Sequence, residues 1–152
     1  MPQLGSSVEH PGVAIGRESL HIVGDCRTGM LSALDLDYYK DGADVMPAIR
    51  AAAHVAGPDY GWIIHNKLQV DMETGVGLNN GLGSLPIVLL DWSNNGGHTW
   101  SNQHPKTVGP MGQYGQRVRW TKLGRARDRV YRITITDPVK RVILGAALNP
   151  ED

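Results

Sequence analysis

Apolar and polar residues alternate with a period of two in short stretches along most of the chain. The clearest example is residues 129–136, in which Tyr131, Ile133 and Ile135 share one face. Because successive side chains of a β-strand point to opposite faces, this period predicts strands with one buried face. The predicted strands are residues 19–23, 31–38, 62–71, 86–92, 117–121 and 129–136.

The predicted strand 31–38 illustrates the pattern and its expected consequence. Leu34, Leu36 and Tyr38 lie on one side of it, and two aspartates alternate with them. This arrangement is typical of a half-buried strand. The two aspartates are therefore expected on a solvated face, not as a catalytic carboxylate pair.

Other segments give weaker or ambiguous signals. Residues 44–56 fit either a short helix or a strand, and residues 139–148 fit a short helix or an edge strand. Residues 101–115 are polar and Gly-rich and are interpreted as a loop. Residues 1–17 lack periodicity and are predicted to form an extended arm. We therefore predict a mainly β chain, with a single antiparallel β-sandwich-like domain over residues 18–152 and at most one or two short helices.

Composition favours many turns. The 152 residues include 19 Gly and 9 Pro, a combined share above the usual level for globular proteins. Lysine and arginine total 15, as do aspartate and glutamate, so the formal net charge is zero. A free-standing nucleic-acid or membrane-surface binder would be strongly basic, and this balance argues against both.

The zero net charge conceals a division along the chain. Residues 1–91 carry eleven acidic and five basic residues, a net charge of −6. Residues 92–152 carry four acidic and ten basic residues, a net charge of +6. This division allows either attraction between copies of the chain or neutralisation within one fold, and the sequence leaves both open.

No residue pattern points to catalysis, a cofactor or a metal. Cys26 is the only cysteine, which excludes an intramolecular disulfide and a four-cysteine zinc site and fits a reducing compartment. The chain has no zinc-binding histidine motif, nucleophile elbow or phosphate-binding glycine loop. It also has neither a run of 18 apolar residues nor a signal-peptide pattern, so synthesis in the cytoplasm is expected. The histidines are His10, His21, His54, His65, His98 and His104.

One loop has a specific sequence pattern. Residues 91–100 read DWSNNGGHTW and fit S-x-D-x-G-x-T-W, the Asp-box best known from sialidase-like β-propellers, with Asn at the usual Asp position. Asn95-Gly96 is a strong hairpin signal, and the Asn95 side-chain oxygen can accept bonds from loop amides. Trp100 is expected to cover the turn. We predict a structural role, with direct sugar contact as the alternative, for Ser93, Asn95, Gly97, Thr99 and Trp100.

Basic residues are concentrated between positions 117 and 132, with Trp120 and Tyr131 among them. Arginine makes two-pronged contacts with phosphate, so one interpretation is a DNA-contacting surface. The others are an interface with the acidic part of a neighbouring subunit and a solvated strand face. The candidate interface residues are Arg117, Arg119, Lys122, Arg125, Arg127, Arg129 and Arg132.

Several motifs follow one another in a fixed order. VLLDWS runs into NNGGHTWS, GPMGQYG and RVRW follow, and LGRARDRVY then precedes TDPVK and GAAL. In these motifs, from about Leu34 to Leu148, the chain resembles the C-terminal part of packaged-DNA stabilisation proteins of short-tailed bacteriophages, the tail hub or nozzle proteins. The ordered set is more specific than the Asp-box pattern alone.

The resemblance implies a virion structural protein without enzymatic activity, made in the host cytoplasm and located in the tail or neck. Its relatives form a ring below the portal and adaptor of the head-to-tail connector and help to retain or conduct packaged DNA. The implied partners are other copies of the chain, the portal and adaptor, other tail proteins and packaged double-stranded DNA, with no membrane in the assembled particle. The relatives are several times longer, so we expect a small connector or tube-wall piece.

Two other classes compete with this interpretation. A carbohydrate-binding module is suggested by the Asp-box, although a propeller needs several such boxes and the chain has one. A DNA- or RNA-binding module is suggested by the basic residues, although the zero net charge and the lack of a known motif argue against it.

Overall fold

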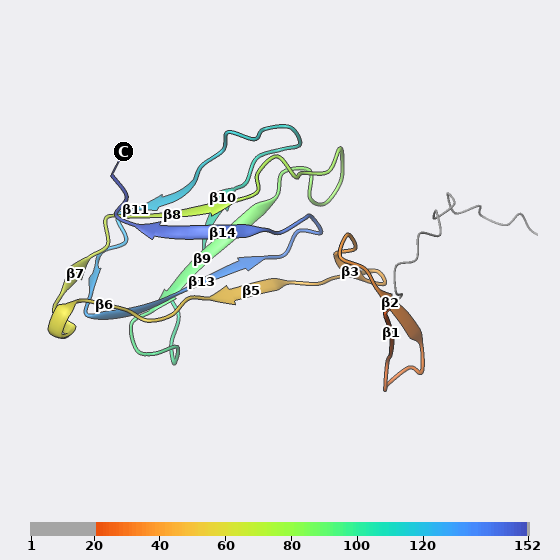
Figure 1. Ribbon diagram of the computed structural model, residues 1–152, viewed down its shortest axis with the longest axis horizontal. Helices are drawn as coiled ribbons and strands as arrows, with labels where there is room; N and C mark the ends of the chain where they lie inside the picture. The colour runs from red at the N-terminus through yellow and green to blue at the C-terminus, as the bar shows by residue number, and fades with distance from the viewer. Residues whose placement is uncertain (1–20, 152) are drawn as a thin grey trace, which may run out of the picture. The chain divides into compact units, whose positions relative to one another are not determined.

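The computed structural model describes residues 21–151, and their regular structure is almost entirely β (Figure 1). Every strand pair in this part of the chain is antiparallel. The helical structure within these residues is limited to a single 3-10 turn at Pro58–Tyr60. The predicted mainly β, antiparallel fold is confirmed.

The chain divides into two units, Met1–Leu36 and Asp37–Asp152. This boundary falls inside the segment 18–152 for which the sequence predicts one domain. The predicted extended arm, residues 1–17, lies outside the described residues.

The described part of the first unit is a two-stranded hairpin, β1 (His21–Gly24) and β2 (Leu31–Leu34). The predicted half-buried strand over residues 31–38 is wrong in both length and burial. The strand ends at Leu34, which is 62% exposed, and Leu36 is 93% exposed. Alternation alone cannot bury a face, because burial requires a second layer that a two-stranded hairpin does not supply.

The second unit contains the two largest sheets. The five-stranded sheet has the order β10-β9-β13-β5, with β6 also paired to β13, and the three-stranded sheet has the order β11-β8-β14. Their strands are β5 (Ala48–Ala51), β6 (Val55–Ala56), β8 (Lys67–Met72), β9 (Ile87–Ser93), β10 (His104–Thr107), β11 (Val118–Thr121), β13 (Asp128–Ile135) and β14 (Ile143–Leu148). Shorter strands are β3 (Lys40–Asp41), β4 (Asp44–Val45), β7 (Ile63–Ile64) and β12 (Arg125–Ala126).

The core lies between these two sheets (Figure 1). Each sheet directs alternate side chains toward the other sheet, and these side chains pack together to form the core. Trp120 also joins the layers, because its indole Nε1 donates a hydrogen bond to the His104 carbonyl oxygen at 2.9 Å. The central core side chains are Leu68, Val70, Val88, Leu90, Val118, Trp120, Tyr131, Ile133 and Ile135.

The three clearest predicted strands are confirmed. Strands β9, β11 and β13 match the predicted residues 86–92, 117–121 and 129–136 to within one residue at each end. The predicted face of Tyr131, Ile133 and Ile135 is buried. The opposite face of β13 is also largely buried, whereas the alternation of apolar and polar residues predicts that only one face is buried.

The ambiguous segments are strands as well. Residues 44–56 contain β4, β5 and β6, and residues 139–148 contain β14, an edge strand. The predicted single strand over residues 62–71 is instead split into β7 and β8.

The predicted loop at residues 101–115 is wrong at His104–Thr107, which forms β10. This strand contains Pro105 and Lys106, and within residues 21–151 it pairs along β9 alone. Proline lacks an N–H for a strand ladder and is tolerated at sheet edges. The pairing therefore depends on the neighbouring strand and not on the strand propensity of these residues.

Leu90→Ala tests the core. Leu90 is fully buried, so the variant should lose about 2–5 kcal/mol of unfolding free energy through lost apolar burial and a cavity. Leu82→Ala, at a side chain that is 62% exposed, should change it by less than about 0.5 kcal/mol. Urea denaturation followed by tryptophan fluorescence measures both, and equal losses would contradict the assigned core.

Candidate functional site

The loop at residues 93–100 is closed by its own side chains. The Ser93 hydroxyl accepts hydrogen bonds from the Gly97 amide at 2.8 Å and the Asn95 amide at 3.3 Å, and it donates to Asn95 Oδ1 at 2.7 Å. Asn95 Oδ1 also accepts from the Thr99 amide at 2.9 Å, and Asn95 Nδ2 donates to Thr99 Oγ1 at 2.9 Å. Asn95 therefore has the acceptor role that the sequence predicts for it.

Trp100 connects this loop to the outer face of the five-stranded sheet. A Cβ on Gly97 would lie 3.7 Å from Trp100 Cζ2, so the ring lies against the turn. The Arg132 guanidinium carbon lies 3.8 Å from the ring centroid. Arg132 donates to both carboxylate oxygens of Asp91, which is 2% exposed, and this pairing raises the pKa of Arg132. The contact between Arg132 and Trp100 therefore joins the loop to the sheet, and the Asp91 carboxylate on the neighbouring strand holds the guanidinium in place.

A cavity of about 290 Å³ lies beside the loop. One wall is Trp92, which is stacked on His104 with ring centroids 4.7 Å apart. No acidic residue lines the cavity, so the usual carboxylate partner of an aromatic glycan site is missing from its lining. The lining residues are Trp92, Asn94, Asn95, Thr99, Trp100 and Ser101.

Ser93→Ala tests the structural role of the loop. Ser93 is 1% exposed, and its loss leaves the Gly97 amide without its side-chain acceptor, so we expect a loss of about 1–3 kcal/mol in unfolding free energy. Asn95→Asp keeps the oxygen that accepts from the Thr99 amide and should cost far less. Thermal denaturation of the two variants distinguishes them, and a neutral Ser93→Ala would contradict the assigned role.

Two arginines of the basic segment flank one exposed aromatic ring. The guanidinium carbons of Arg125 and Arg127 lie 4.8 Å and 5.2 Å from the ring centroid of Trp62, which is 57% exposed. Neither arginine has a carboxylate partner within residues 21–151. Exposed stacking of this kind is worth about 0.5–1 kcal/mol and leaves the guanidinium donors accessible to a ligand.

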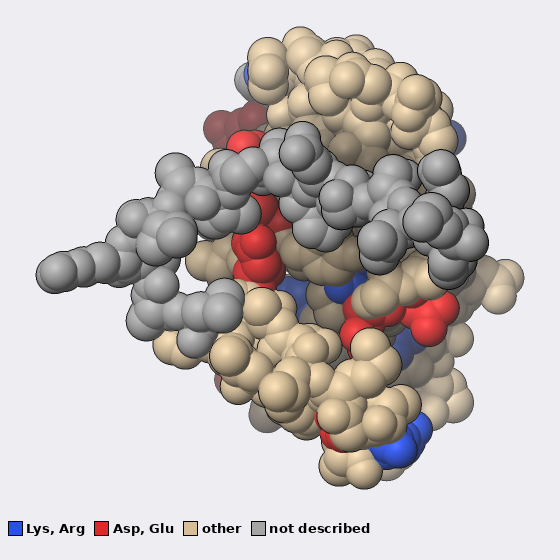
Figure 2. All heavy atoms as spheres, turned by 90° about the vertical axis from the view of Figure 1, so that its right-hand side faces the viewer, with Lys and Arg blue, Asp and Glu red and all other residues tan. Residues whose placement is uncertain are grey.

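The other basic residues of the segment have different surroundings. Arg132 is paired with Asp91, and Arg119 donates to a glutamine side chain at 2.8 Å on the three-stranded sheet. Arg117 and Lys122 are exposed at other positions. On the face drawn in Figure 2, the charged atoms at the surface are mainly those of Asp and Glu.

Arg129 is buried, with 2% of its surface exposed, although the sequence places it among the interface candidates. Its Nε donates to Asn94 Oδ1 at 2.8 Å, its Nη1 to the Leu123 carbonyl at 2.6 Å, and its Nη2 to the Arg125 carbonyl at 3.4 Å. These acceptors are neutral, so carbonyl and amide oxygens compensate the buried charge. The side chain joins two loops to β13 and is not on the surface of the described fold.

His65 extends this buried polar group, although no sequence motif distinguishes it from the other histidines. The ring is fully buried, with Nδ1 2.8 Å from the Tyr131 hydroxyl, which lies 3.5 Å from Arg129 Nη1. Its Nε2 has no partner among the described residues. Burial and the charge of Arg129 lower the pKa of His65, so the ring is neutral near pH 7. In the sequence, His65 follows two isoleucines, and this pattern alone does not distinguish a buried, hydrogen-bonded histidine from an exposed one.

Stability should fall as the pH drops below about 6.5. The His65 pKa is lowered from 6.5 in the folded protein, so the unfolded chain binds the proton more readily. The stabilising contribution is complete above the ordinary histidine pKa and decreases below it. Urea midpoints at several pH values should therefore decline less steeply for His65→Gln than for the parent protein. His21→Gln, at an exposed position, is the control, and equal slopes for all three proteins would contradict this assignment.

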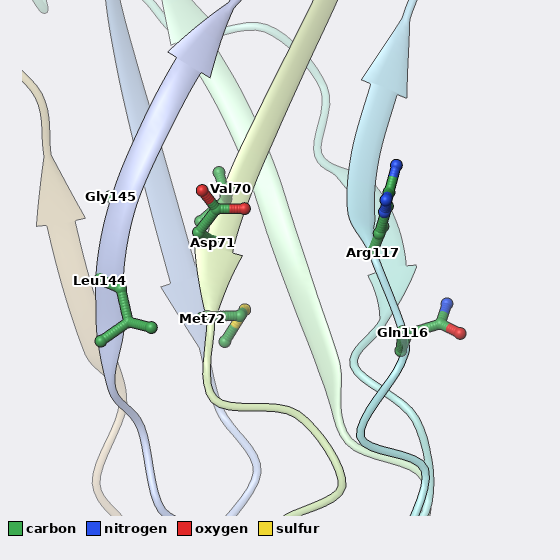
Figure 3. A pocket seen from close by; sticks show the side chains of 7 residues that line it. All are labelled: Val70, Asp71, Met72, Gln116, Arg117, Leu144 and Gly145. Carbon is green, nitrogen blue, oxygen red and sulfur yellow. The ribbon is translucent and has the colours of Figure 1, made fainter. Parts of the chain in front are cut away.

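A shallow pocket of about 440 Å³ lies on the three-stranded sheet (Figure 3). Asp71 projects from β8 between Leu144 of β14 and Arg117, which precedes β11. Asp71 Oδ1 also accepts from Gln69 Nε2 at 3.0 Å. Asp71 and Arg117 are the charged residues of this lining. They form neither a general acid–base pair nor a nucleophile with its activating base.

Residues 21–151 were also compared with the requirements of a metal site and of a membrane-spanning helix. Residues 21–151 contain no group of three or more His, Cys, Asp or Glu side chains that could hold a metal ion. Cys26 is a free, exposed thiol. No helix among these residues is long and apolar enough to cross a membrane.

Comparison with known proteins identifies the sandwich. A family model described as "Bacteriophage P22 Gp10, beta-sandwich" matches residues 48–151, which is more than half of the chain. The match begins at β5 and extends beyond β14, so it includes both large sheets and the loop at residues 93–100. No curated protein matches the chain.

Proposed function

The chain belongs to the family of the bacteriophage P22 Gp10 beta-sandwich domain, and on this basis we propose that it is a subunit of the head-to-tail connector or tail hub of a phage particle. The family is one of bacteriophage structural proteins. The subunit forms a homo-oligomeric ring below the portal and adaptor, in the tail or neck of the virion. The ring helps to retain or conduct packaged DNA and involves no catalytic step.

The observation that carries this proposal is the family match over both sheets of the sandwich. Membership in a family of phage structural proteins supports a place in the virion. The position in the neck or tail is the finer part of the proposal, and it is supported by the ordered motifs shared with tail hub proteins.

The charge distribution supports assembly of identical subunits. Two of these opposite charges pair within the fold, Arg132 with Asp91 and Lys140 with Glu73. Exposed charges outside such pairs remain able to attract unlike charges on neighbouring copies. Head-to-tail contacts of this kind close into a ring when the rotation between subunits is suitable. The portal, the adaptor and other tail proteins are the further partners of such a ring.

Arg125 and Arg127 are the basic residues best suited to DNA. Both stack on Trp62 and keep donors exposed, whereas Arg129 is buried and Arg132 is paired with Asp91. Guanidinium groups lining a channel would contact phosphates without reading sequence. Within the proposed ring we therefore assign the phosphate contacts to the Arg125–Arg127 pair.

Quantitative peptide mass spectrometry of purified phage particles tests the position in the virion. A connector ring requires a fixed copy number related to that of the portal protein, either equal to it or half of it. We expect this ratio to be constant between preparations. Absence of the chain from particles would overturn the proposal and would favour the carbohydrate-binding alternative.

The DNA contact is tested by the salt dependence of duplex binding. The double variant Arg125→Ala/Arg127→Ala should bind DNA with a weaker salt dependence. The slope of log K against log salt is negative, and its magnitude should fall by about 1.8, because each lost phosphate contact contributes about 0.9. Lys106→Ala/Lys140→Ala removes the same charge from two other exposed positions and should leave the slope closer to that of the parent protein. Fluorescence anisotropy with a labelled duplex measures the slopes. Equal slopes for the two double variants would exclude the Arg125–Arg127 pair as the contact.

A further inference from the structure

The sandwich is open along one side, where an apolar groove of about 690 Å³ reaches the core. Its floor includes Leu68 and Val70 of β8 and Ile133 of β13, all of which belong to the buried cluster. Its rim includes Ala52 and Ala146. The groove is therefore an extension of the hydrophobic core that the described residues do not fill.

Two sheet edges border this groove. Strand β5 ends the five-stranded sheet, and β14 ends the three-stranded sheet. No described strand pairs with the outer edge of either, so each presents backbone N–H and C=O groups without a ladder partner. Strand β14 is the longer edge, and near its start Leu144 is 76% exposed. An extended segment can therefore add to β14 and place apolar side chains into the groove.

The charged residues that line the groove are all basic. Arg50 is opposite Ile133 in the β5–β13 register, which places it on the core side of the sheet. Arg141 has a buried Nε without a hydrogen-bond partner within residues 21–151, and its Nη2 donates to the Tyr39 carbonyl at 3.3 Å. His54 also lines the groove and is paired with Asp128. An occupant with apolar side chains and a net negative charge suits this lining.

The β1–β2 hairpin has these properties. Every side chain of both strands is exposed, including Ile22 at 59%, Leu31 at 75% and Leu34 at 62%. A two-stranded hairpin without a covering layer is marginally stable in water, so it requires a partner. Residues 21–36, the described part of the unit that contains the hairpin, carry Asp25, Asp35 and Arg27, a net charge of −1.

We propose that the β1–β2 hairpin of one copy of the chain docks on β14 of a second copy and fills the apolar groove. The hairpin extends the three-stranded sheet of its neighbour, and its leucines cover the exposed core. Repetition of this contact links subunits head to tail. The inference rests on the proposed function in one respect, which is that identical subunits assemble.

Disulfide trapping between two differently tagged proteins tests this contact. One protein carries Cys26→Ser with Ser32→Cys on β2, and the other carries Cys26→Ser with Ala146→Cys on the rim of the groove. Both engineered positions are exposed and small, so folding should be preserved. Mild oxidation of the mixture should give a heterodimer on a non-reducing gel.

The matched control places the second cysteine at Thr121, an exposed residue on β11 at the opposite edge of the same sheet. Heterodimer formation with Ala146→Cys and not with Thr121→Cys supports the proposal. Equal trapping at both positions, or trapping at neither, overturns it. A protein that carries both Ser32→Cys and Ala146→Cys shows whether the hairpin binds its own chain. If it forms an intrachain disulfide and no trapping occurs between copies, the occupant of the groove is not a second copy.

Sedimentation of a surface variant provides a test without cysteines. Leu34→Lys should weaken self-association by at least about tenfold, because a leucine that becomes buried in the contact is lost. Leu82→Lys is the matched control, since both leucines are 62% exposed, and it should associate like the parent protein. Equal association of the two variants overturns the docking proposal. A normal copy number in particles together with that result would leave the proposed function intact.

Discussion

Burial of both faces of β13 is the constraint on which the rest of the sandwich depends. This strand pairs with β9 on one side and with β5 and β6 on the other. Tyr131, Ile133 and Ile135 face the second sheet and form much of the core. Val130 and Thr134 on the other face are also buried, with 7% and 9% exposure. A strand enclosed in this way fixes the register of its neighbours, because a slip by one residue would exchange the two faces.

Charge on β13 is accommodated by two different means. Arg129 is held by neutral oxygens at one end of the strand, and Arg132 is paired with the buried Asp91. Removing a partner from either arginine would leave a buried or half-buried charge uncompensated, which is costly. The basic residues of β13 therefore stabilise the fold, while those of the preceding segment remain exposed around Trp62.

The surfaces that remain available for partners have distinct chemistry. The outer surface around Trp62 is cationic and aromatic, which suits phosphate. The groove between β5 and β14 is apolar with a basic rim, which suits an extended peptide segment. A ring subunit needs one surface for its neighbour and another for its contents. The two surfaces share no residue, which is compatible with both contacts at the same time.

The sequence by itself determined the features that depend on local interactions. Period-two alternation identified β9, β11 and β13, because a strand in a two-layer protein must place alternate side chains in the core. The short-range pattern at Ser93, Asn95 and Thr99 indicated the loop contacts, since all these partners lie within a few residues of one another. The ordered motifs also indicated the phage family.

Only the tertiary structure decided what lies opposite each residue. The burial of Arg129 and His65 depends on loops and strands distant in sequence, so neither residue could be separated from the exposed basic and histidine residues beforehand. Strand β10 forms because β9 offers it an edge, despite Pro105 and Lys106. The exposure of the β1–β2 hairpin and of the groove likewise depends on whether another surface covers them. Alternation indicates which face of a strand is apolar, whereas burial depends on a second surface that the local sequence does not specify.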